Sequence, residues 1–477
     1  MSLAIVWFRR DLRLADNPAL SLALRQHRRV LPLYIHAPHE ESPWEPGAAS
    51  RWWLHHSLAA LAAELERRGA PLEVHAGDSL AVLQNLVRRC GADAVYWNRL
   101  YEPSALARDQ QVEQALKAQG VAVCLGNASL LAEPGEITTG QGGPYRVFTP
   151  YWRNLRARLQ PSPPAGVPAR LDSCAPAGGL ALAQLGLLPR RPWDAGFYSA
   201  WKPGEAGAGL ALSAFCEDVV QVYAQQRDIP AIGGTSRLSA HLHFGEISPR
   251  QIHWALHELG CSRGARCHEA AEPFLRELGW REFAHHLLYH FPQTTQQDLN
   301  PDFGGFAWRE PETELLTAWQ RGRTGIPMID AGMRELWETG WMHNRVRMLT
   351  ASFLCKNLRI HWRHGARWFW DTLVDADLAN NTLGWQWSAG TGADAAPYFR
   401  IFNPVTQGER FDPDGAYVKR WLPQLARLAF KSVHAPWKQP DLLARSGYAQ
   451  PMVDLAASRE AALQAYRNRT APRLRGV

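Results

Sequence analysis

The sequence predicts two domains of different class: an α/β domain built on a doubly wound parallel sheet, followed by an entirely helical domain. Three features lead to this prediction. Short apolar runs alternate with amphipathic stretches as far as residue 130. Proline, glycine and alanine dominate residues 131–202, and helical patterns without intervening strands then continue to residue 468. We expect an α/β domain at residues 1–130, an interdomain linker at 131–202 and a helical domain at 203–477.

In the first domain, strands and helices are expected to alternate without interruption. Apolar, β-branched runs predict strands at residues 4–8, 30–35, 72–74, 94–97 and 121–124. Amphipathic patterns between them predict helices at residues 17–28, 49–68, 79–90 and 104–119. Such a sheet binds ligands beyond the carboxyl ends of its strands, where we find residues 8–11, His36, Asn98, Arg99, Tyr101 and Glu102. No glycine-rich phosphate motif opens these helices, which disfavours a dinucleotide or a nucleoside triphosphate bound in the usual way.

Helix signals continue through the linker and the second domain. A periodic stretch at residues 147–159 predicts a helix that carries Tyr151 and Trp152. Beyond residue 210, prolines and capping residues mark the starts of amphipathic helices at residues 248–250, 272–274 and 326–328, and a further helix is expected around Trp368.

The composition is that of a globular protein that stays in the cytosol. The 477 residues include 52 Lys and Arg against 45 Asp and Glu, and the resulting net charge of +7 is compatible with a phosphate-contacting surface. No run of about 18 apolar residues predicts a membrane span, and no secretion signal is present. The seven cysteines lack metal-ligand spacing, so we expect reduced, mostly buried thiols and no metal. Several of the 21 tryptophans stand beside arginine, which suits stacking on bases or a planar cofactor, although a helical core explains most of them.

Residues 375–387 form the densest group of functional side chains, with two carboxylates two residues apart, an amide pair and two indoles. Asn and Thr side chains compete for backbone hydrogen bonds, so Asn380, Asn381 and Thr382 predict a turn and not a helix. This turn either lines a ligand or simply connects two helices, and these residues alone favour neither reading.

Three more segments of the helical domain carry candidate binding residues. Tyr223 and Arg227 precede a glycine pair and hydroxyls at residues 233–239, which suit an anionic phosphate but equally a helix cap. Within residues 274–283, Glu277 and Arg281 are four apart and would pair on a helix surface. At residues 340–348, a Gly-Trp break before His-Asn-Arg-x-Arg concentrates donors where a helix begins.

These segments together resemble the photolyase/cryptochrome family. They read Gly-Thr-Ser-Arg-Leu-Ser at 234–239, Trp-Arg-Glu-Phe at 280–283, Trp-Met-His-Asn-Arg at 341–345 and Gly-Trp-Gln-Trp-Ser at 384–388. Their order and spacing match the family over nearly the whole chain. The resemblance implies an α/β antenna domain and a helical domain that holds FAD. It also implies a deoxyribodipyrimidine photo-lyase, a carbon-carbon lyase that splits cyclobutane pyrimidine dimers with an electron from photoexcited reduced FAD.

The resemblance assigns two groups of residues to FAD. Around the phosphates it places Tyr223, Thr235, Ser236, Arg237, Leu238 and Ser239. Near the flavin and ribose it places Trp280, Asn344, Arg347, Asp375, Asp377 and Asn381. Arg347 and Asp375 would form an ion pair beside the flavin ring. Asn381 would face flavin N5, where an amide adds no negative charge beside the anionic reduced flavin. Plant cryptochromes carry Asp at that place, so Asn381 favours repair.

A dimer flipped out of the duplex needs stacking walls and polar partners for its edge. By resemblance Trp280 and Trp387 are the walls and Glu277 bonds the thymine edge. Catalysis would involve Glu277, Asn344 and Asn381. The substrate contacts would be Arg227, Glu277, Trp280, Arg281, Asn344, Arg345, Met348, Trp387 and Gln407. Phe274 departs from the Trp common in related repair enzymes but keeps an apolar wall, and Asn344 after His343 follows the pattern for dimer repair and not the (6-4) pattern.

Trp308, Trp362 and Trp385 match the family's electron relay from the protein surface to oxidised flavin. Each one alone would be read as a core residue.

Residues 50–56, 101–109 and 143–150 look like the class III branch nearest plant cryptochromes. That branch implies a methenyltetrahydrofolate antenna, with 8-hydroxy-deazaflavin or an empty site as alternatives. The alternatives to repair are a cryptochrome-like blue-light photoreceptor and a flavin- and nucleic-acid-binding protein without catalysis. We expect a cytoplasmic monomer that binds dimer-containing DNA and no membrane.

Overall fold

The computed structural model describes residues 2–174 and 178–469, and the chain divides into two compact units. The first unit comprises Met1–Gln221, Ser236–Pro292 and Val374–Asp377. The second comprises Val222–Thr235, Gln293–Leu373 and Leu378–Val477. Neither unit is therefore a single stretch of chain.

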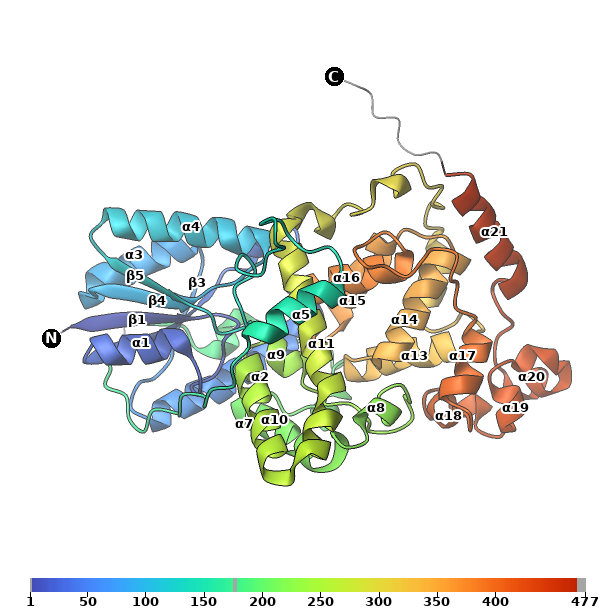
Figure 1. Ribbon diagram of the computed structural model, residues 1–477, viewed down its shortest axis with the longest axis horizontal. Helices are drawn as coiled ribbons and strands as arrows, with labels where there is room; N and C mark the ends of the chain where they lie inside the picture. Colours follow the sequence, from blue (N-terminus) through green and yellow to red (C-terminus); the bar gives the residue numbers. More distant parts are fainter. Residues whose placement is uncertain (1, 175–177, 470–477) are drawn as a thin grey trace, which may run out of the picture. The chain divides into compact units, whose positions relative to one another are not determined.

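The first unit contains the predicted sheet (Figure 1). Its five strands are parallel and lie in the order β3-β2-β1-β4-β5. The strands are β1 (Leu3–Phe8), β2 (Arg29–His36), β3 (Glu73–Ala76), β4 (Ala94–Asn98) and β5 (Ala122–Gly126). The helices between them are α1 (Pro18–Gln26), α2 (Ala48–Arg67), α3 (Ser79–Cys90) and α4 (Pro103–Ala118). The order steps outward from β1 in both directions, which confirms the doubly wound class.

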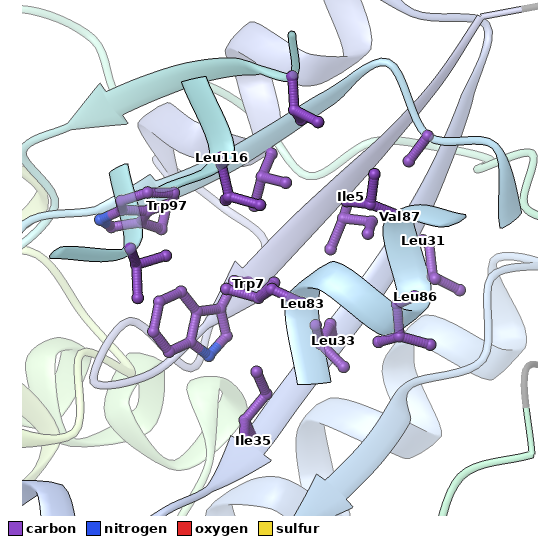
Figure 2. Close-up of a cluster of buried hydrophobic side chains, with 14 of the residues drawn as sticks. Ile5, Trp7, Leu31, Leu33, Ile35, Leu83, Leu86, Val87, Trp97 and Leu116 are labelled. Atoms are coloured by element: carbon purple, nitrogen blue, oxygen red, sulfur yellow. The ribbon is translucent and has the colours of Figure 1, made fainter. Parts of the chain in front are cut away.

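One face of the sheet packs against α3 and α4 (Figure 2). Because side chains alternate along a strand, Leu3, Ile5 and Trp7 of β1 all point into this layer. Trp7 meets Trp97 of β4 edge to face, with ring centroids 5.7 Å apart. These buried indoles lie near the ends of β1 and β4, next to the loops that follow those strands.

The interior of β2 accommodates a proline. Pro32 pairs with Val6 of β1, while pairing with β3 begins only at Leu33. Two residues before Pro32, Val30 donates its N–H to the Asp172 carbonyl at 2.9 Å. N–H groups two residues apart point to the same side of a strand, so the N–H that Pro32 lacks would have faced the β3 side, just before pairing with β3 begins.

Helices complete the first unit. They are α5 (Phe148–Arg158), α6 (Phe197–Ala200), α7 (Glu205–Ala214), α9 (Ser239–His243), α10 (Pro249–Arg263) and α11 (Ala265–His290). The predicted helices at residues 147–159 and 248–250 are confirmed, and Ser248 caps α10 through a capping box.

The helix predicted to start at residues 272–274 begins earlier, so that prediction is wrong. Pro273 lies inside α11. A proline in a helix removes a hydrogen bond and costs about 3 kcal/mol. The helix continues because a buried apolar stripe with spacings of three and four runs past the proline. This stripe consists of Cys267, Ala271, Phe274 and Leu278.

The described part of the second unit consists of helices, with an isolated bridge between Arg309 and Ile360. The helices are α8 (Tyr223–Gln226), α12 (Thr313–Gln320), α13 (Pro327–Thr339), α14 (Asn344–Ser352), α15 (Trp362–Thr372), α16 (Leu378–Ala389), α17 (Pro404–Phe411), α18 (Ala416–Trp421), α19 (Phe430–Val433), α20 (Pro440–Ser446) and α21 (Leu455–Arg467). Across both units, short 3-10 and π helices lie at Pro38–Glu41, Leu182–Leu185, Phe215–Val219, Pro292–Thr295, Pro301–Phe303, Phe353–Asn357, Pro423–Leu425 and Pro436–Lys438. Pro327 opens α13 and Trp368 lies in α15, as predicted.

Each of the seven cysteines is free, but only Cys267 and Cys355 are buried. The expectation of mostly buried thiols is therefore wrong. One reason is visible at Cys124, which lies in β5, an edge strand of the sheet whose outer side has no partner strand. Within residues 2–174 and 178–469, no helix has the length and apolar composition that crossing a membrane requires.

Candidate functional site

The polar residues beyond the strands of the sheet largely bond to one another. Asn98 donates from Nδ2 to Asp11 Oδ2 at 2.5 Å and to Asn17 Oδ1 at 2.8 Å. Arg10 pairs with Glu102, with Arg10 Nη2 lying 2.7 Å from Glu102 Oε2. These contacts bind the loop after β1 to the loops after β4. Several of the residues that the sequence suggested as ligand contacts at the strand ends, such as Asn98 and Glu102, therefore stabilise the fold through these contacts.

Two carboxylates at the start of residues 375–387 are held by helices of the first unit. Ser239 of α9 donates its hydroxyl to Asp375 Oδ2 at 2.7 Å. Asp377 Oδ2 lies 3.5 Å from His243 Nδ1 in α9 and 3.5 Å from His285 Nε2 in α11. The two aspartates are 8% and 7% exposed, so these contacts set where their carboxylates point.

His285 carries a proton on both ring nitrogens in this arrangement. Its Nδ1 lies 3.0 Å from the Arg281 carbonyl, which can only accept, so Nδ1 is the donor. Its Nε2 faces an ionised carboxylate, which also only accepts. Burial alone would lower the pKa of His285, but Asp377 raises this pKa above its ordinary value. Burial would likewise raise the pKa of Asp377, but His285 and His243 hold it well below the ordinary range.

Trp280 of α11 is held as a flat wall by α5. Its indole stacks on Phe148 with ring centroids 3.8 Å apart and planes 9° from parallel. A Cβ added at Gly279 would lie 2.5 Å from the Trp152 ring, so a glycine is needed for α5 to approach α11 this closely. The orientation of the Trp280 indole is thus fixed by packing.

The next residues of α11 face the chain near residue 130. Arg281 donates to the Ser129 carbonyl at 2.6 Å, and the Glu282 carboxylate accepts from the backbone N–H of Leu131 at 2.8 Å. Burial raises the pKa of Glu282 to about 7, with Arg281 acting in the opposite direction. Glu277, one turn before Arg281, is half-buried. The predicted substrate contact of Arg281 stays a prediction.

The glycine pair and the hydroxyls that follow it have a constrained backbone. A Cβ at Gly234 would lie 2.6 Å from the Gln226 carbonyl, which only glycine avoids. Arg237 adopts a left-handed conformation with φ of 56°, and its guanidinium carbon lies 4.0 Å from the centre of the Trp201 ring.

In the second unit, the segment that precedes Gly233 and Gly234 forms an ion pair with α14. The Arg345 guanidinium lies 2.6 Å from the Asp228 carboxylate, as an ion pair. Arg347 donates from Nε to the Met342 carbonyl at 2.7 Å. Asn344, the first residue of α14, has an exposed side chain. The predicted concentration of hydrogen-bond donors at a helix N-terminus is therefore observed at α14. The sequence did not reveal Asp228 as the acidic partner of Arg345.

The turn predicted at residues 375–387 is wrong for most of its length, because α16 begins at Leu378. Asn381 donates from Nδ2 to the Ala366 carbonyl in α15 at 3.0 Å. Its amide is thus engaged by a neighbouring helix and does not compete with the backbone of α16. Tertiary bonding explains why this Asn-rich segment stays helical.

The three tryptophans predicted to form an electron relay belong to the second unit and lie in or near α15. A Cβ at Gly365 would lie 2.0 Å from Trp385 Cη2, so the indole presses directly on the helix backbone. Trp362 lies one turn before Gly365 on the same helix. The ring of His361 is 5.4 Å from that of Trp362 and 5.0 Å from that of Trp308, centroid to centroid.

Exposure divides the predicted site residues into three groups. Ser239 and Asn344 are exposed. Half-buried side chains are Arg227, Thr235, Ser236, Arg237, Glu277, Trp280, Arg281, Trp308, Arg345, Arg347, Met348, Asn381, Trp387 and Gln407. Buried side chains are Tyr223, Leu238, Trp362, Asp375, Asp377 and Trp385.

Comparison with known proteins identifies the family. Residues 4–169 match the family described as DNA photolyase, and residues 274–468 match the FAD binding domain of DNA photolyase. The chain is 46% identical over 473 residues to a deoxyribodipyrimidine photo-lyase from Agrobacterium fabrum strain C58, covering 97% of both chains.

The chain belongs to the photolyase/cryptochrome family. It is also similar to cryptochrome-2 from Arabidopsis thaliana, with 39% identity over 96% of this chain and 77% of that one. The crystal structure of a bacterial class III photolyase from Agrobacterium tumefaciens has a TM-score of 0.93 and 45% identity, covering 98% of this chain and 97% of that chain.

The residues present fit the FAD that this family's helical domain binds. A flavin dinucleotide needs donors for its phosphates, acceptors for its ribose hydroxyls and a polar partner for the flavin edge. Within the first unit, Ser239 offers an exposed hydroxyl and Arg237 offers a half-buried cation. The buried Asp375 carboxylate already accepts a hydroxyl hydrogen bond, which is what a ribose acceptor must do.

Residues that the sequence did not single out orient several predicted ones. They are Phe148 behind Trp280, His243 and His285 beside Asp377, Asp228 beside Arg345, and Asp298 beside Trp362. All these partners are distant in sequence, so local patterns carry no signal for them.

Proposed function

We propose that this chain is a deoxyribodipyrimidine photo-lyase that uses light to split cyclobutane pyrimidine dimers in DNA. The observation that carries the proposal is 46% identity to a deoxyribodipyrimidine photo-lyase along 97% of both chains. The fold of a solved class III photolyase matches with a TM-score of 0.93. When bound, FAD supplies the light-excited electron donor, and the protein residues orient cofactor and lesion.

For FAD binding, we assign the phosphates to Tyr223, Thr235, Ser236, Arg237, Leu238 and Ser239. The flavin and ribose are assigned to Trp280, Asn344, Arg347, Asp375, Asp377 and Asn381. The ion pair between His285 and Asp377 supports this assignment, because it fixes a buried acceptor next to Asp375.

Asn381 is assigned to the flavin N5 edge. Its Nδ2 donates to the Ala366 carbonyl, so the orientation of the amide is fixed before cofactor binds. A neutral amide there leaves the anionic reduced flavin without a repelling carboxylate.

The lesion pocket is assigned to Trp280 and Trp387 as stacking walls and to Glu277 as the acceptor for the thymine edge. Trp280 is suited to this role because Phe148 supports its indole from one side. The other assigned contacts are Arg227, Arg281, Asn344, Arg345, Met348 and Gln407. We propose Trp385, Trp362 and Trp308 as the electron relay.

We further propose methenyltetrahydrofolate as antenna, with 8-hydroxy-deazaflavin or an empty site as the alternatives. Denaturing the purified protein and recording the absorption and fluorescence of the released chromophores distinguishes these outcomes. We also keep a monomeric state and a cytoplasmic location, where DNA is accessible, as proposals.

A second candidate function is blue-light signalling without repair, because the chain is 39% identical to cryptochrome-2 over 96% of its length. The test illuminates purified, FAD-containing protein with an oligonucleotide carrying one thymine dimer and assays restored thymines, with a dark sample alongside. The lyase proposal predicts light-dependent repair by the chemically reduced protein. Bound, reduced FAD without any repair would favour the photoreceptor.

A further inference from the structure

The indole N–H of Trp362, the middle tryptophan of the proposed relay, has a carboxylate partner. Trp362 Nε1 donates to Asp298 Oδ1 at 2.7 Å. Trp362 is fully buried and Asp298 is half-buried. An indole N–H buried this deeply needs an acceptor, but a neutral carbonyl or amide would satisfy it without burying a charge. The use of a carboxylate is therefore what calls for explanation.

The surroundings of Trp362 are otherwise unfavourable for a positive charge. Trp362 is the first residue of α15, where the helix dipole is positive, and Arg363 follows it. His361 is neutral in ordinary conditions, because burial and the nearby Arg363 lower its pKa to about 4. Asp298 is thus the acidic side chain that directly contacts this indole. Burial raises the pKa of its carboxyl, while the hydrogen bonds from Trp362 and Thr391 and the nearby Arg363 act in the opposite direction.

Asp298 is also held rigidly in place. Gln386 of α16, which is 2% exposed, donates from Nε2 to the Gln297 carbonyl at 2.8 Å and accepts from the Leu299 backbone N–H at 3.0 Å. These two bonds clamp the chain on both sides of Asp298. Gln386 adjoins Trp385, so the residue that fixes the carboxylate is a sequence neighbour of the relay tryptophan.

We propose that Asp298 is the counter-ion of oxidised Trp362 and makes this indole a better electron donor to oxidised Trp385. The inference rests on the proposed relay. Bound, oxidised FAD would supply the light-excited acceptor for one electron from Trp385. One electron then moves from Trp362 to oxidised Trp385, which restores Trp385 and leaves a positive hole on Trp362. No proton leaves in this step. The negative charge of Asp298 stabilises the hole, because a carboxylate in hydrogen-bond contact lies well inside the range of strong Coulomb attraction.

The test replaces the charge and keeps the hydrogen bond. Asp298→Asn retains an acceptor oxygen for the Trp362 N–H, whereas Asp302→Asn makes the same chemical change at an exposed position of the same segment. Both variants and the wild type are loaded with oxidised FAD and illuminated with an external reductant, at about pH 8 so that carboxylates are ionised. We expect photoreduction of FAD to slow by roughly tenfold or more in Asp298→Asn and to stay at the wild-type rate in Asp302→Asn. Equal rates in Asp298→Asn and wild type would overturn the proposal.

A second measurement separates charge from packing. In a Trp308→Phe background the hole stops at Trp362, and time-resolved absorption gives the lifetime of its radical. Adding Asp298→Asn should shorten that lifetime by roughly tenfold, and adding Asp298→Glu should preserve most of it, because glutamate keeps the charge. Equal lifetimes for the Asn and Glu variants would contradict the counter-ion role, even if either variant is less stable. Repair by the reduced wild type is measured separately, so a failure of the lyase proposal is distinguished from a failure at Asp298.

Discussion

At the scale of single residues, the charges next to the predicted cofactor residues are balanced within the first unit. Asp377 is flanked by His243 and His285, each 3.5 Å away. The Arg281 carbonyl accepts from His285 Nδ1, and Asp377, which lies opposite Nε2, raises the pKa of His285 against the effect of burial. A buried carboxylate paired in this way stays ionised, so it remains an acceptor. Its conformation is therefore set before any ligand arrives.

Trp385→Phe tests the relay at its first member. Phenylalanine fills much of the same space against α15 but is far harder to oxidise than an indole. We expect light-driven reduction of bound FAD to be lost, while repair by chemically reduced protein continues. Absorbance of the bound flavin under illumination measures photoreduction, and the number of restored thymines measures repair. Normal photoreduction in this variant would exclude the assignment of Trp385.

Glu277→Ala tests the lesion pocket. Loss of a hydrogen bond to a charged acceptor weakens transition-state binding by about 1.5–3 kcal/mol, so repair should slow by roughly tenfold or more while FAD stays bound. Glu277→Gln is the matched control, because its amide keeps an acceptor oxygen and should retain part of the activity. An unchanged repair yield in the alanine variant would remove Glu277 from the site.

Glu282 predicts a pH dependence of stability. Burial raises its pKa from 4.5 to about 7. Between these values the folded chain keeps a proton that the unfolded chain has lost, so the free energy of unfolding falls as pH rises. Glu282→Gln does not titrate and keeps an oxygen for the Leu131 N–H. As pH rises from 4.5 to about 7, we expect the free energy of unfolding of the wild type to fall by up to about 3 kcal/mol relative to this variant.

Comparing the wild type with Glu282→Gln cancels the contributions that other titrating groups make to the pH dependence of stability. The pKa values of His286, His343 and His361 are lowered to about 4, chiefly by burial, and these residues stabilise the fold as pH rises in both proteins. Urea unfolding of both proteins at about pH 5 and about pH 8 measures the difference. If the wild type and Glu282→Gln differ in free energy of unfolding by the same amount at both pH values, burial does not raise the pKa of Glu282.

At the scale of elements, α15 and α16 approach closely enough that one helix has a glycine against a tryptophan of the other. Gly365→Ala would place a methyl group 2.0 Å from Trp385 Cη2. Overpacking of this kind destabilises by about 1–3 kcal/mol, and the displaced indole should also slow photoreduction. Gly384→Ala on α16 is the control, since its Cβ meets nothing within 4 Å and should be neutral or stabilising by up to about 1 kcal/mol. Equal thermal stability of the two variants would argue against tight packing here.

Elements were predictable where local pattern decides them and not where tertiary contacts override it. The strands and helices of the sheet follow from apolar alternation, and Ser248 and Pro327 mark helix starts as expected. Pro273 misled because a buried stripe carries α11 past it. Asn381 misled because its amide bonds to Ala366 in another helix. Both failures are cases in which a distant partner supplies what the local sequence lacks.

The same limit applies to the candidate site. Motifs in the sequence pointed to Trp280, Asp377 and Trp362, whose side chains would bear the chemistry. The residues that orient them come from other elements and have no local signature: Phe148, His285 and Asp298. Sequence reasoning therefore finds the residues of a site more readily than the supports that fix their geometry.

At the scale of the whole molecule, the fold is shared with a solved photolyase and a solved cryptochrome, so fold alone does not decide between the two candidate functions. The relatives include a deoxyribodipyrimidine photo-lyase at 46% identity and a cryptochrome at 39%. The two compact units do not follow single cuts along the chain, since Ser236–Pro292 and Val374–Asp377 belong to the unit that contains the sheet. The predicted boundaries of domains and linker stay predictions.

A lyase returns the electron that opens the dimer, so one reduced FAD should serve many dimers in succession. The most direct measurement counts the thymines restored per bound FAD in chemically reduced protein, under continuous light, after the reductant has been removed. Repair that exceeds the bound FAD many times over, while the flavin stays reduced, is the predicted result. Repair that is absent, or that stops after one dimer per FAD, would contradict a photolyase.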